Sequence, residues 1–318
     1  MTYARIKGTG SYLPKKILTN QDLEIMVDTS HEWIVERTGI ERRHVSAKDE
    51  SSVSMAIIAA KEALNTANIL PEHIELIIVA TATPDHFFPS AACMVQNALG
   101  ITNECPAFDV SAACAGFIYG MSIANQYIRS GVIKTALVIG ADSLTKLVDW
   151  SDRSTCILFG DGAAAVVLGA DNKPGILSTH IHANGTYAGL LSATNGIKPQ
   201  DQDHHIKMKG NAVFRVAVKT LDKIVGETLA ANNMQKSDID WLIPHQANLR
   251  IIKATAKKLD LPMSRVILGV EDQGNTSAAS IPLALDQAVR AGKIQRNENL
   301  LMEAFGAGFT WGSALVKY

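Results

Sequence analysis

An internal repeat constrains the fold of this chain more than any single motif does. Ile-Glu-Leu-Ile-Ile at 74–78 resembles Ile-Asp-Trp-Leu-Ile at 239–243, 165 residues later, and a helix-like segment and a short polar turn precede each copy. Arg-Ser-Gly at 129–131 likewise resembles Arg-Ala-Gly at 290–292, 161 residues later. A repeat of this length predicts two copies of one folding unit, with a pseudo-twofold axis that brings matching junctions together at the centre.

The hydrophobic pattern within each copy favours a layered α/β fold. Apolar runs such as Glu75–Ala80 and Ala136–Gly140 alternate with helix-like segments such as Ser54–Ala67 and Ala115–Ser130. Because the apolar residues are continuous and do not alternate with polar ones, we expect strands in sheets that are covered on both faces.

A cluster of turn-forming residues, Ala-Asp-Asn-Lys-Pro-Gly at 170–175, lies near the middle of the 318-residue chain. No linker rich in Pro, Gly and Ser interrupts the sequence. We therefore place the boundary between the two copies at this turn, with an N-terminal half at 1–172 and a C-terminal half at 173–318.

Cys114 lies where an apolar segment ends and a long helix-like run begins. A thiol at a helix N-terminus experiences the positive end of the helix dipole, which favours the thiolate and predicts a catalytic nucleophile. Free cysteines also act as small buried apolar residues, so position alone leaves both interpretations open. An offset of 161 residues leads from Cys114 to Asn275, which we therefore expect at the matching strand-to-helix junction of the second half.

Two later segments contain polar residues that could act with Cys114. His245 follows a strand-like segment in Pro-His-Gln-Ala-Asn (244–248), and Asn275 lies in Gly-Asn-Thr-Ser-Ala-Ala-Ser (274–280). Taken alone, a histidine at a strand end is most simply structural, and an asparagine between Gly and Thr is most simply a turn residue or a helix cap. Their place in the repeat favours a common site with Cys114 instead.

Four motifs, in chain order, resemble the signatures of the β-ketoacyl-acyl-carrier-protein synthase III family: Ala-Cys-Ala-Gly at 113–116, the segments 244–248 and 274–280, and Phe-Gly-Ala-Gly-Phe-Thr-Trp-Gly at 305–312. The similarity extends from Gly8 to the C-terminus. It implies the thiolase fold, an α/β fold in which duplicated βαβ-rich halves form an α-β-α-β-α arrangement. It also implies an acyltransferase that initiates type II fatty acid synthesis.

The resemblance implies a two-step condensation. Cys114 takes the acyl group of a short acyl-CoA, expected to be acetyl-CoA, and releases CoA. Malonyl-acyl carrier protein then loses CO2, and N–H donors of His245 and Asn275 stabilise its enolate, which gives a 3-oxoacyl-acyl carrier protein. The backbone N–H groups of Cys114 and Ala307 form the oxyanion hole for acyl transfer. The commoner family pattern has Gly where this chain has Ala307, which puts the shape of the pocket in doubt.

The family's CoA contacts also have matches in this chain. Trp33 and Arg153 match the residues that clamp the adenine ring in the family. Such a clamp suits adenine because a planar guanidinium stacks on aromatic faces. Thr29, Arg37 and Asn211 are expected to contact other parts of CoA. For Trp33, half-buried packing is the alternative that the sequence leaves open.

Other residues match the family's protein contacts. Phe88 is expected to reach the primer pocket of a partner subunit across a homodimer interface, or else simply to pack there. Arg250, Lys253, Lys257 and Lys258 follow His245, and positions 250, 253 and 257 share one face of a helix. We expect this face to bind the acidic carrier protein, with a merely solvated basic face as the alternative.

Composition and charge exclude several other functions. A formal net charge of −1 argues against a nucleic-acid-binding protein. The four cysteines have no C-x-x-C spacing, which predicts reduced thiols. With no signal peptide and no apolar run near the ~20 residues of a membrane span, we expect a cytoplasmic enzyme that does not enter membranes. His180 and His182 could suggest a metal site, but without a nearby set of Cys, Asp or Glu ligands we expect no metal, and no cofactor, since acyl-CoA is a substrate.

Two other functions stay open as alternatives. A related condensing enzyme could use Cys114, His245 and Asn275 with another primer to make a polyketide, quinolone or branched-chain product. A non-catalytic acyl-carrier-binding module would not need these three residues, so their presence disfavours it. The sequence does not determine the length or branching of the primer.

Overall fold

The computed structural model describes residues 2–195, 197 and 203–318. Its largest sheet comes wholly from the N-terminal part of the chain, with the strand order β1 (Tyr3–Tyr12), β7 (Asp161–Asp171), β6 (Thr135–Ser143), β4 (Ile77–Ala80) and β5 (Ala107–Val110). β4 pairs in parallel with β5 and β6, whereas β7 pairs antiparallel with β1 and β6. Strands β4 and β6 are almost entirely buried, as the continuous apolar runs predict.

A second sheet repeats this arrangement with later residues, in the order β11 (Trp241–Pro244), β12 (Asn299–Gly306), β13 (Thr310–Lys317) and β8 (Ile176–Ala183). The pairing directions match strand by strand, so that β11 corresponds to β4, β12 to β6, β13 to β7 and β8 to β1. The counterpart of β5 is reduced to one parallel bridge between Leu242 and Val266. The duplicated α/β fold predicted from the repeat is therefore confirmed.

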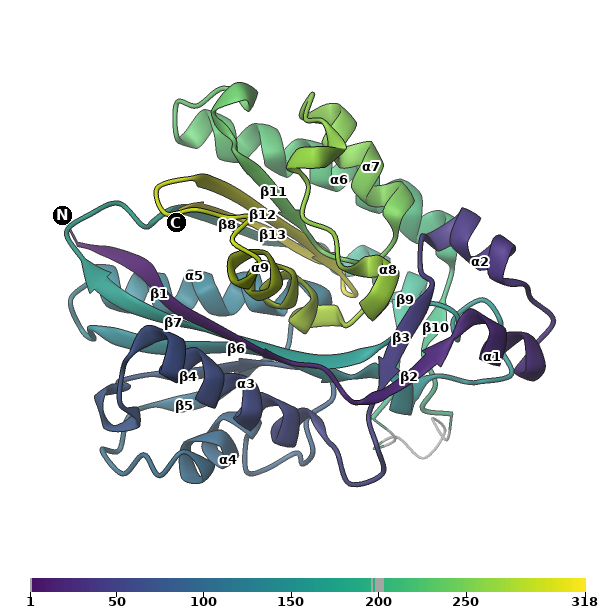
Figure 1. The fold of residues 1–318 in the computed structure, drawn as a ribbon, viewed down its shortest axis with the longest axis horizontal. Coiled ribbons are helices and arrows are strands. Elements are labelled where there is room, and N and C mark those ends of the chain that lie inside the picture. The colour runs from purple at the N-terminus through teal and green to yellow at the C-terminus, as the bar shows by residue number, and fades with distance from the viewer. Residues whose placement is uncertain (1, 196, 198–202) are drawn as a thin grey trace.

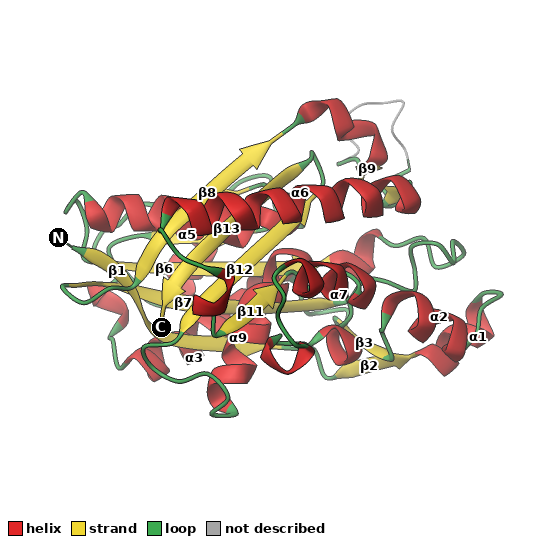
Figure 2. Cartoon of the chain, turned by 90° about the horizontal axis from the view of Figure 1, so that it is seen from above, coloured by secondary structure: helices red, strands yellow, loops and turns green. Residues whose placement is uncertain are grey.

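Helices cover both sheets in three layers (Figure 1). The outer face of the first sheet packs against α3 (Ser52–Ala67) and α4 (Ala91–Ala98), the space between the sheets holds α5 (Gly116–Arg129) and α9 (Ser280–Arg290), and the outer face of the second sheet packs against α6 (Gly210–Ala231) and α7 (Leu249–Lys258). Figure 2 shows α6 running along its sheet. The predicted α-β-α-β-α arrangement is thus confirmed. Within the described ranges, no helix combines the length and apolar character that crossing a membrane requires.

Smaller elements connect the strands and helices of these layers. One group is α1 (Asn20–Met26), α2 (His31–Thr38) and the ribbon of β2 (Lys16–Thr19) with β3 (Arg42–Val45), which project together at one end of the molecule (Figure 1). The others are α8 (Val270–Gln273), the ribbon of β9 (Leu191–Ser192) with β10 (Lys207–Met208), and the 3₁₀ helices η1 (Pro71–His73), η2 (Ala113–Ala115), η3 (Leu144–Leu147), η4 (Gly185–Leu190), η5 (Lys236–Asp238), η6 (Met263–Arg265) and η7 (Ser277–Ala279).

The two strand-to-helix junctions match in place, but the residue match predicted from the repeat is wrong by three positions. Ala113 and Ser277 begin η2 and η7, and both have a left-handed backbone, with φ of 45° and 52°. By this match the counterpart of Cys114 is Ala278, and Asn275 lies three residues earlier. The offset of 161 holds at the helix C-termini, because α9 has 11 residues where α5 has 14.

Candidate active site

The backbone around Cys114 is held by close approach of the second sheet. Cys114 lies in η2, and its side chain is buried at 8% exposure. A Cβ on Gly306, at the end of β12, would lie only 2.6 Å from the backbone nitrogen of Cys114, so this close approach requires glycine. The Thr310 hydroxyl lies 2.8 Å from the carbonyl oxygen of Ala112 and 3.2 Å from that of Ala307. These contacts bring the backbone of Ala307 to the junction that contains Cys114.

The environment of the Cys114 thiol differs from the prediction based on the helix dipole. Burial raises the pKa of Cys114 to about 12, and a nearby charge on Asp142 acts in the same direction. A hydrogen bond with the Ser277 hydroxyl acts the other way but does not compensate. Burial of the thiol therefore opposes the thiolate that the position at the helix N-terminus predicts.

Asp142 is a buried residue that the sequence motifs did not identify. It ends the apolar run of β6, and its Oδ1 accepts a hydrogen bond from the Ala82 N–H at 2.7 Å, while Oδ2 accepts one from the Ala278 N–H at 3.1 Å. By the duplication, Ala278 corresponds to Cys114 and Asp142 corresponds to Gly306. At the second junction, Asp142 accepts a hydrogen bond from the backbone N–H of Ala278. At the first junction, Gly306 takes the place of Asp142 and has no side chain, so the backbone N–H of Cys114 has no such acceptor.

His245 follows β11 and lies between two fixed partners. Its backbone N–H donates to the carbonyl oxygen of Glu303 at 2.8 Å, and its Nδ1 lies 2.6 Å from the Ser280 hydroxyl oxygen. Burial lowers the pKa of His245 to about 4, so the imidazole is neutral at pH 7. A neutral imidazole with Nδ1 engaged presents Nε2 as its other polar atom.

Asn275 is fixed through both its backbone and its side chain. Its backbone N–H donates to Leu158 at 2.8 Å, and its carbonyl oxygen accepts from the Gly160 N–H at 3.0 Å, which joins it to the segment before β7. Its side-chain Oδ1 accepts a hydrogen bond from the Ser277 N–H at 2.9 Å. The amide N–H2 group is therefore the end left for other partners.

Cys114, His245 and Asn275 line one cavity of about 320 Å³. The structure therefore brings together the three residues that the motifs selected. Much of the remaining wall is apolar and comes from α6, α7 and β12, with the side chains of Val213, Phe214, Ala217, Leu221, Ile251 and Phe305. No sequence motif predicted this wall, because its residues are apolar positions on three separate elements.

The predicted CoA residues fall into two groups. Trp33, Arg37 and Asn211 line the cavity, whereas Thr29 and Arg153 are outside its lining. The guanidinium groups of Arg37 and Arg153 lie 4.6 Å and 5.2 Å from the centre of the Trp33 ring. Arg153 thus lies beside Trp33, where it also bonds to the carbonyl oxygen of Asp28, and the clamp on adenine stays a prediction.

Phe88 lies away from this cavity. It is 87% exposed, and it lines a second hollow of about 910 Å³ together with Phe87, which is 69% exposed. Within one chain it therefore lines a different hollow from Cys114, His245 and Asn275, and its role across an interface stays a prediction.

The predicted basic face forms on α7. Arg250 lines the cavity, with its guanidinium 5.3 Å from the centre of the Phe214 ring. Lys253 and Lys257 are exposed on the same helix. Lys258 instead pairs with Asp222 of α6 at 3.4 Å, so its charge is partly neutralised within the chain.

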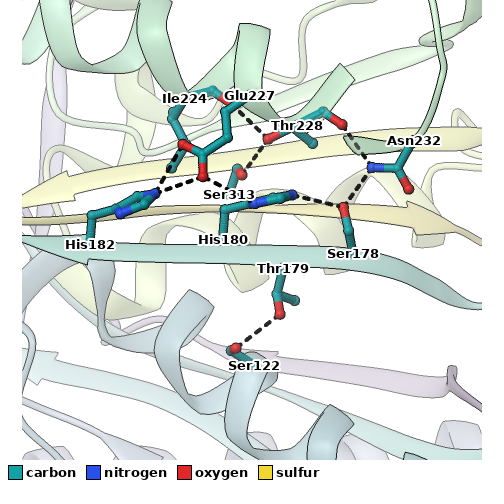
Figure 3. A network of polar contacts seen from close by, with 10 residues as sticks. All are labelled: Ser122, Ser178, Thr179, His180, His182, Ile224, Glu227, Thr228, Asn232 and Ser313. Atoms are coloured by element: carbon teal, nitrogen blue, oxygen red, sulfur yellow. Dashed lines mark hydrogen bonds and ion pairs between the residues drawn. The ribbon is translucent and has the colours of Figure 1, made fainter. Parts of the chain in front are cut away.

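His180 and His182 have a carboxylate partner that the sequence did not place beside them. Both project from β8 towards Glu227 of α6, as Figure 3 shows, with nitrogen-to-oxygen distances of 3.3 Å and 3.0 Å. The expectation that no acidic residue lies nearby is thus wrong. Even so, among the described residues no group of three or more His, Cys, Asp or Glu is arranged to hold a metal ion.

The comparisons with known proteins agree on one family. Two models described as 3-oxoacyl-(acyl-carrier-protein) synthase III match the chain, one at 108–185 and its C-terminal part at 229–318. A β-ketoacyl-(acyl-carrier-protein) synthase III from Methylococcus capsulatus is 58% identical over 99% of both chains. The crystal structure of such an enzyme from Aquifex aeolicus has 48% identity and a TM-score of 0.95, covering 99% of this chain and 100% of that one. The priming β-ketosynthase of the R1128 polyketide pathway has 36% identity and a TM-score of 0.93, covering 99% and 96%.

Proposed function

This chain belongs to the β-ketoacyl-acyl-carrier-protein synthase III family of thiolase-fold acyltransferases, and we propose that it condenses a short acyl-CoA with malonyl-acyl carrier protein to initiate fatty acid synthesis. The products are a 3-oxoacyl-acyl carrier protein, CoA and CO2. The observation that supports this most directly is the single cavity that a thiol, a neutral imidazole and a fixed amide line together.

In the first half-reaction, the sulfur of Cys114 forms a bond to the acyl carbon, and the bond to the CoA sulfur breaks. The proton of Cys114 leaves with the CoA thiol. The backbone N–H of Cys114 is directed at the carbonyl oxygen as negative charge develops there, with that of Ala307 as its second donor. The absence of a side chain at Gly306 supports this role, because the equivalent N–H of Ala278 is occupied by Asp142.

In the second half-reaction, the malonyl group loses CO2 and its electron pair forms a carbon–carbon bond to the acyl carbon. Cys114 leaves as a thiolate and takes up a proton, so one proton is consumed overall. His245 and Asn275 donate hydrogen bonds to the thioester oxygen of the enolate. Because both are neutral and already held in place, they stabilise the developing charge without first reorganising.

Substrate recognition follows from the surfaces around the cavity. CoA binds with its adenine between Trp33 and Arg153 and with Arg37, Thr29 and Asn211 along the rest of its length. The basic face of Arg250, Lys253 and Lys257 beside the entrance receives the acidic carrier protein, to which Lys258 contributes less because it pairs with Asp222. No cofactor is needed, since acyl-CoA is consumed.

In this proposal, the enzyme is a homodimer and lies in the cytoplasm. The exposed pair Phe87 and Phe88 is the surface through which two copies meet, because adjacent large apolar side chains are normally covered. Phe88 then limits the primer pocket of the partner and favours an acetyl group. The four cysteines are free, as expected in a reducing compartment.

A direct assay tests the proposed reaction. Purified protein is given malonyl-acyl carrier protein with acetyl-, isobutyryl- or octanoyl-CoA, and the 3-oxoacyl-acyl carrier protein is measured. We expect acetyl-CoA to be the best primer. Product from a branched or long primer only would support the polyketide, quinolone or branched-chain alternative, and no acyl transfer at all would support a carrier-binding module.

A further inference from the structure

Ser280 contacts the catalytic histidine from the beginning of α9. Its side-chain oxygen lies 2.6 Å from Nδ1 of His245 and accepts the backbone N–H of Gln246 at 3.3 Å. Ser280 is completely buried, and His245 is 7% exposed, so water does not compete for this contact. We infer that the Ser280 hydroxyl is a positioning group that holds His245 in the tautomer with its proton on Nε2.

The direction of the hydrogen bond follows from counting donors. The Gln246 N–H donates to one lone pair of the Ser280 oxygen, and the hydroxyl proton needs an acceptor of its own. Among the hydrogen bonds of the described residues, the hydroxyl has no carbonyl acceptor, unlike Thr38 and Thr228, which bond to carbonyls one helical turn earlier. Nδ1 is therefore its acceptor, and a neutral ring that accepts at Nδ1 has its proton on Nε2.

The backbone that orients Ser280 is itself rigid. The side chain of Gln246 donates to the carbonyl oxygens of Pro244 and Ile267 and accepts from the N–H groups of Gly269 and Val270, at 2.6 to 3.2 Å. All its amide hydrogen-bonding positions are thus in use inside the protein. The Gln246 N–H consequently keeps the Ser280 oxygen in its acceptor role.

The duplicated half shows that the fold does not require this hydroxyl. By the strand and helix match, His245 corresponds to Ala80 and Ser280 corresponds to Gly116. A Cβ on Gly116 would lie 3.0 Å from the Cβ of Ala80, so the same contact exists there between apolar groups. The contact is polar in only one of the two halves, which points to a role of Ser280 in the reaction.

This assignment restricts what His245 can do. An Nε2–H group donates a hydrogen bond, as the malonyl enolate requires, but it cannot take a proton from Cys114. That the Nε2–H group donates to the enolate rests on the proposed function, whereas the tautomer of His245 is a property of the protein alone.

The tautomer can be measured directly in the intact protein. ¹⁵N-labelled histidine is incorporated, and the His245 signals are assigned by comparison with His245→Ala. We expect a protonated Nε2 and a hydrogen-bond-accepting Nδ1 at pH 7. A protonated Nδ1 would overturn the inference, whatever the activity of the enzyme.

Variants then test the consequence for catalysis. Ser280→Ala should lower kcat of condensation about fivefold, since one net hydrogen bond is worth ~1 kcal/mol, with KM and self-acylation nearly unchanged. Ser280→Thr, which keeps the hydroxyl, should restore most of the rate. Ser122→Ala is the matched control: it removes another buried serine hydroxyl, bonded to Thr179 at 2.9 Å on the helix of the other half (Figure 3), and should leave kcat unchanged.

The outcomes separate this inference from the proposed function. A kcat of Ser280→Ala equal to that of the unmodified protein would refute the positioning role even if His245→Ala is inactive. Full condensation by His245→Ala would instead refute the proposed function, while the measured tautomer would still decide the role of Ser280.

Discussion

The side-chain oxygen of Asn275 accepts a hydrogen bond from the backbone N–H of Ser277 at 2.9 Å. This bond fixes which end of the amide is free, because Oδ1 is occupied and the N–H2 group is not. Asn275 and His245 thus both reach the cavity with one side-chain atom held by the protein. In the proposed mechanism, both act as donors on a charge that arises only after Cys114 has been acylated.

His245→Ala and Asn275→Ala, tested separately, should therefore each lower condensation about a hundredfold or more, as for the loss of one prearranged donor. Each variant should still accept an acetyl group from acetyl-CoA. Rapid-quench measurement of acyl transfer beside the full condensation assay tests this. If His245→Ala loses acyl transfer as completely as condensation, His245 is the base for Cys114. The proposal that His245 acts only in condensation would then be wrong.

Cys114→Ala should abolish transfer of radiolabelled acetyl to the protein. Cys156→Ala, which also removes a buried thiol, is the matched control and should keep full labelling. Stoichiometric labelling of Cys114→Ala would show that another residue is the nucleophile.

The reactivity of Cys114 should depend steeply on pH. Because burial raises its pKa to about 12, the thiolate fraction, and with it the rate of alkylation by iodoacetamide, should increase about tenfold per pH unit from pH 7 to 10. Mass spectrometry of the peptide that contains Cys114 distinguishes it from the exposed Cys93. A rate that levels off below pH 8 would mean that the helix dipole, and not burial, controls this thiol.

Glu303 should make the folded protein less stable as pH rises. It is fully buried on β12, and burial raises its pKa from 4.5 to about 8, although the nearby Thr255 hydroxyl acts in the opposite direction. Between these values the folded state keeps a proton that the unfolded state releases, so this group's stabilisation is complete below about pH 4.5 and is lost as pH rises towards 8.

Glu303→Gln removes that titration. Urea unfolding at pH 5 and pH 8 should therefore show a smaller loss of unfolding free energy for the variant than for the unmodified protein, by more than about 1 kcal/mol. Equal losses in the two proteins would show that Glu303 ionises in the folded state at its ordinary pKa.

Reversing the charges of the basic face should weaken only the carrier-protein step. Arg250→Glu, Lys253→Glu and Lys257→Glu together should raise KM for malonyl-acyl carrier protein at least tenfold, with acetyl transfer from acetyl-CoA within a few-fold of normal. The control changes three exposed lysines elsewhere, Lys61, Lys134 and Lys173, to Glu, with the same change in net charge. An unchanged KM would identify a merely solvated basic face.

The sequence located the site well but not its supporting contacts. Cys114, His245 and Asn275 could be found because each lies in a motif at a predicted junction. Ser280 and Asp142 could not, because their partners are 35 and 136 residues away and are brought close only by packing of the two halves. The burial of the Cys114 thiol, which raises its pKa, could not be predicted for the same reason, since burial is a property of the folded chain.

The residue match between the halves failed for a local reason. Matching apolar segments fix which strands and helices correspond, but a helix can lose residues without changing its neighbours. The three-residue difference between α5 and α9 therefore shifts the alignment at their N-termini, where Cys114 lies, although the helix C-termini remain matched.

The left-handed turn is present in both halves, at Ala113 and at Ser277, although only the first is followed by a cysteine. Such a backbone costs on the order of 1–3 kcal/mol for a residue with a side chain. Because Ala278 stands where the other half has Cys114, that cost cannot be ascribed to activating a thiol. The turn is part of the framework that both halves share, and only one half uses it to present a thiol.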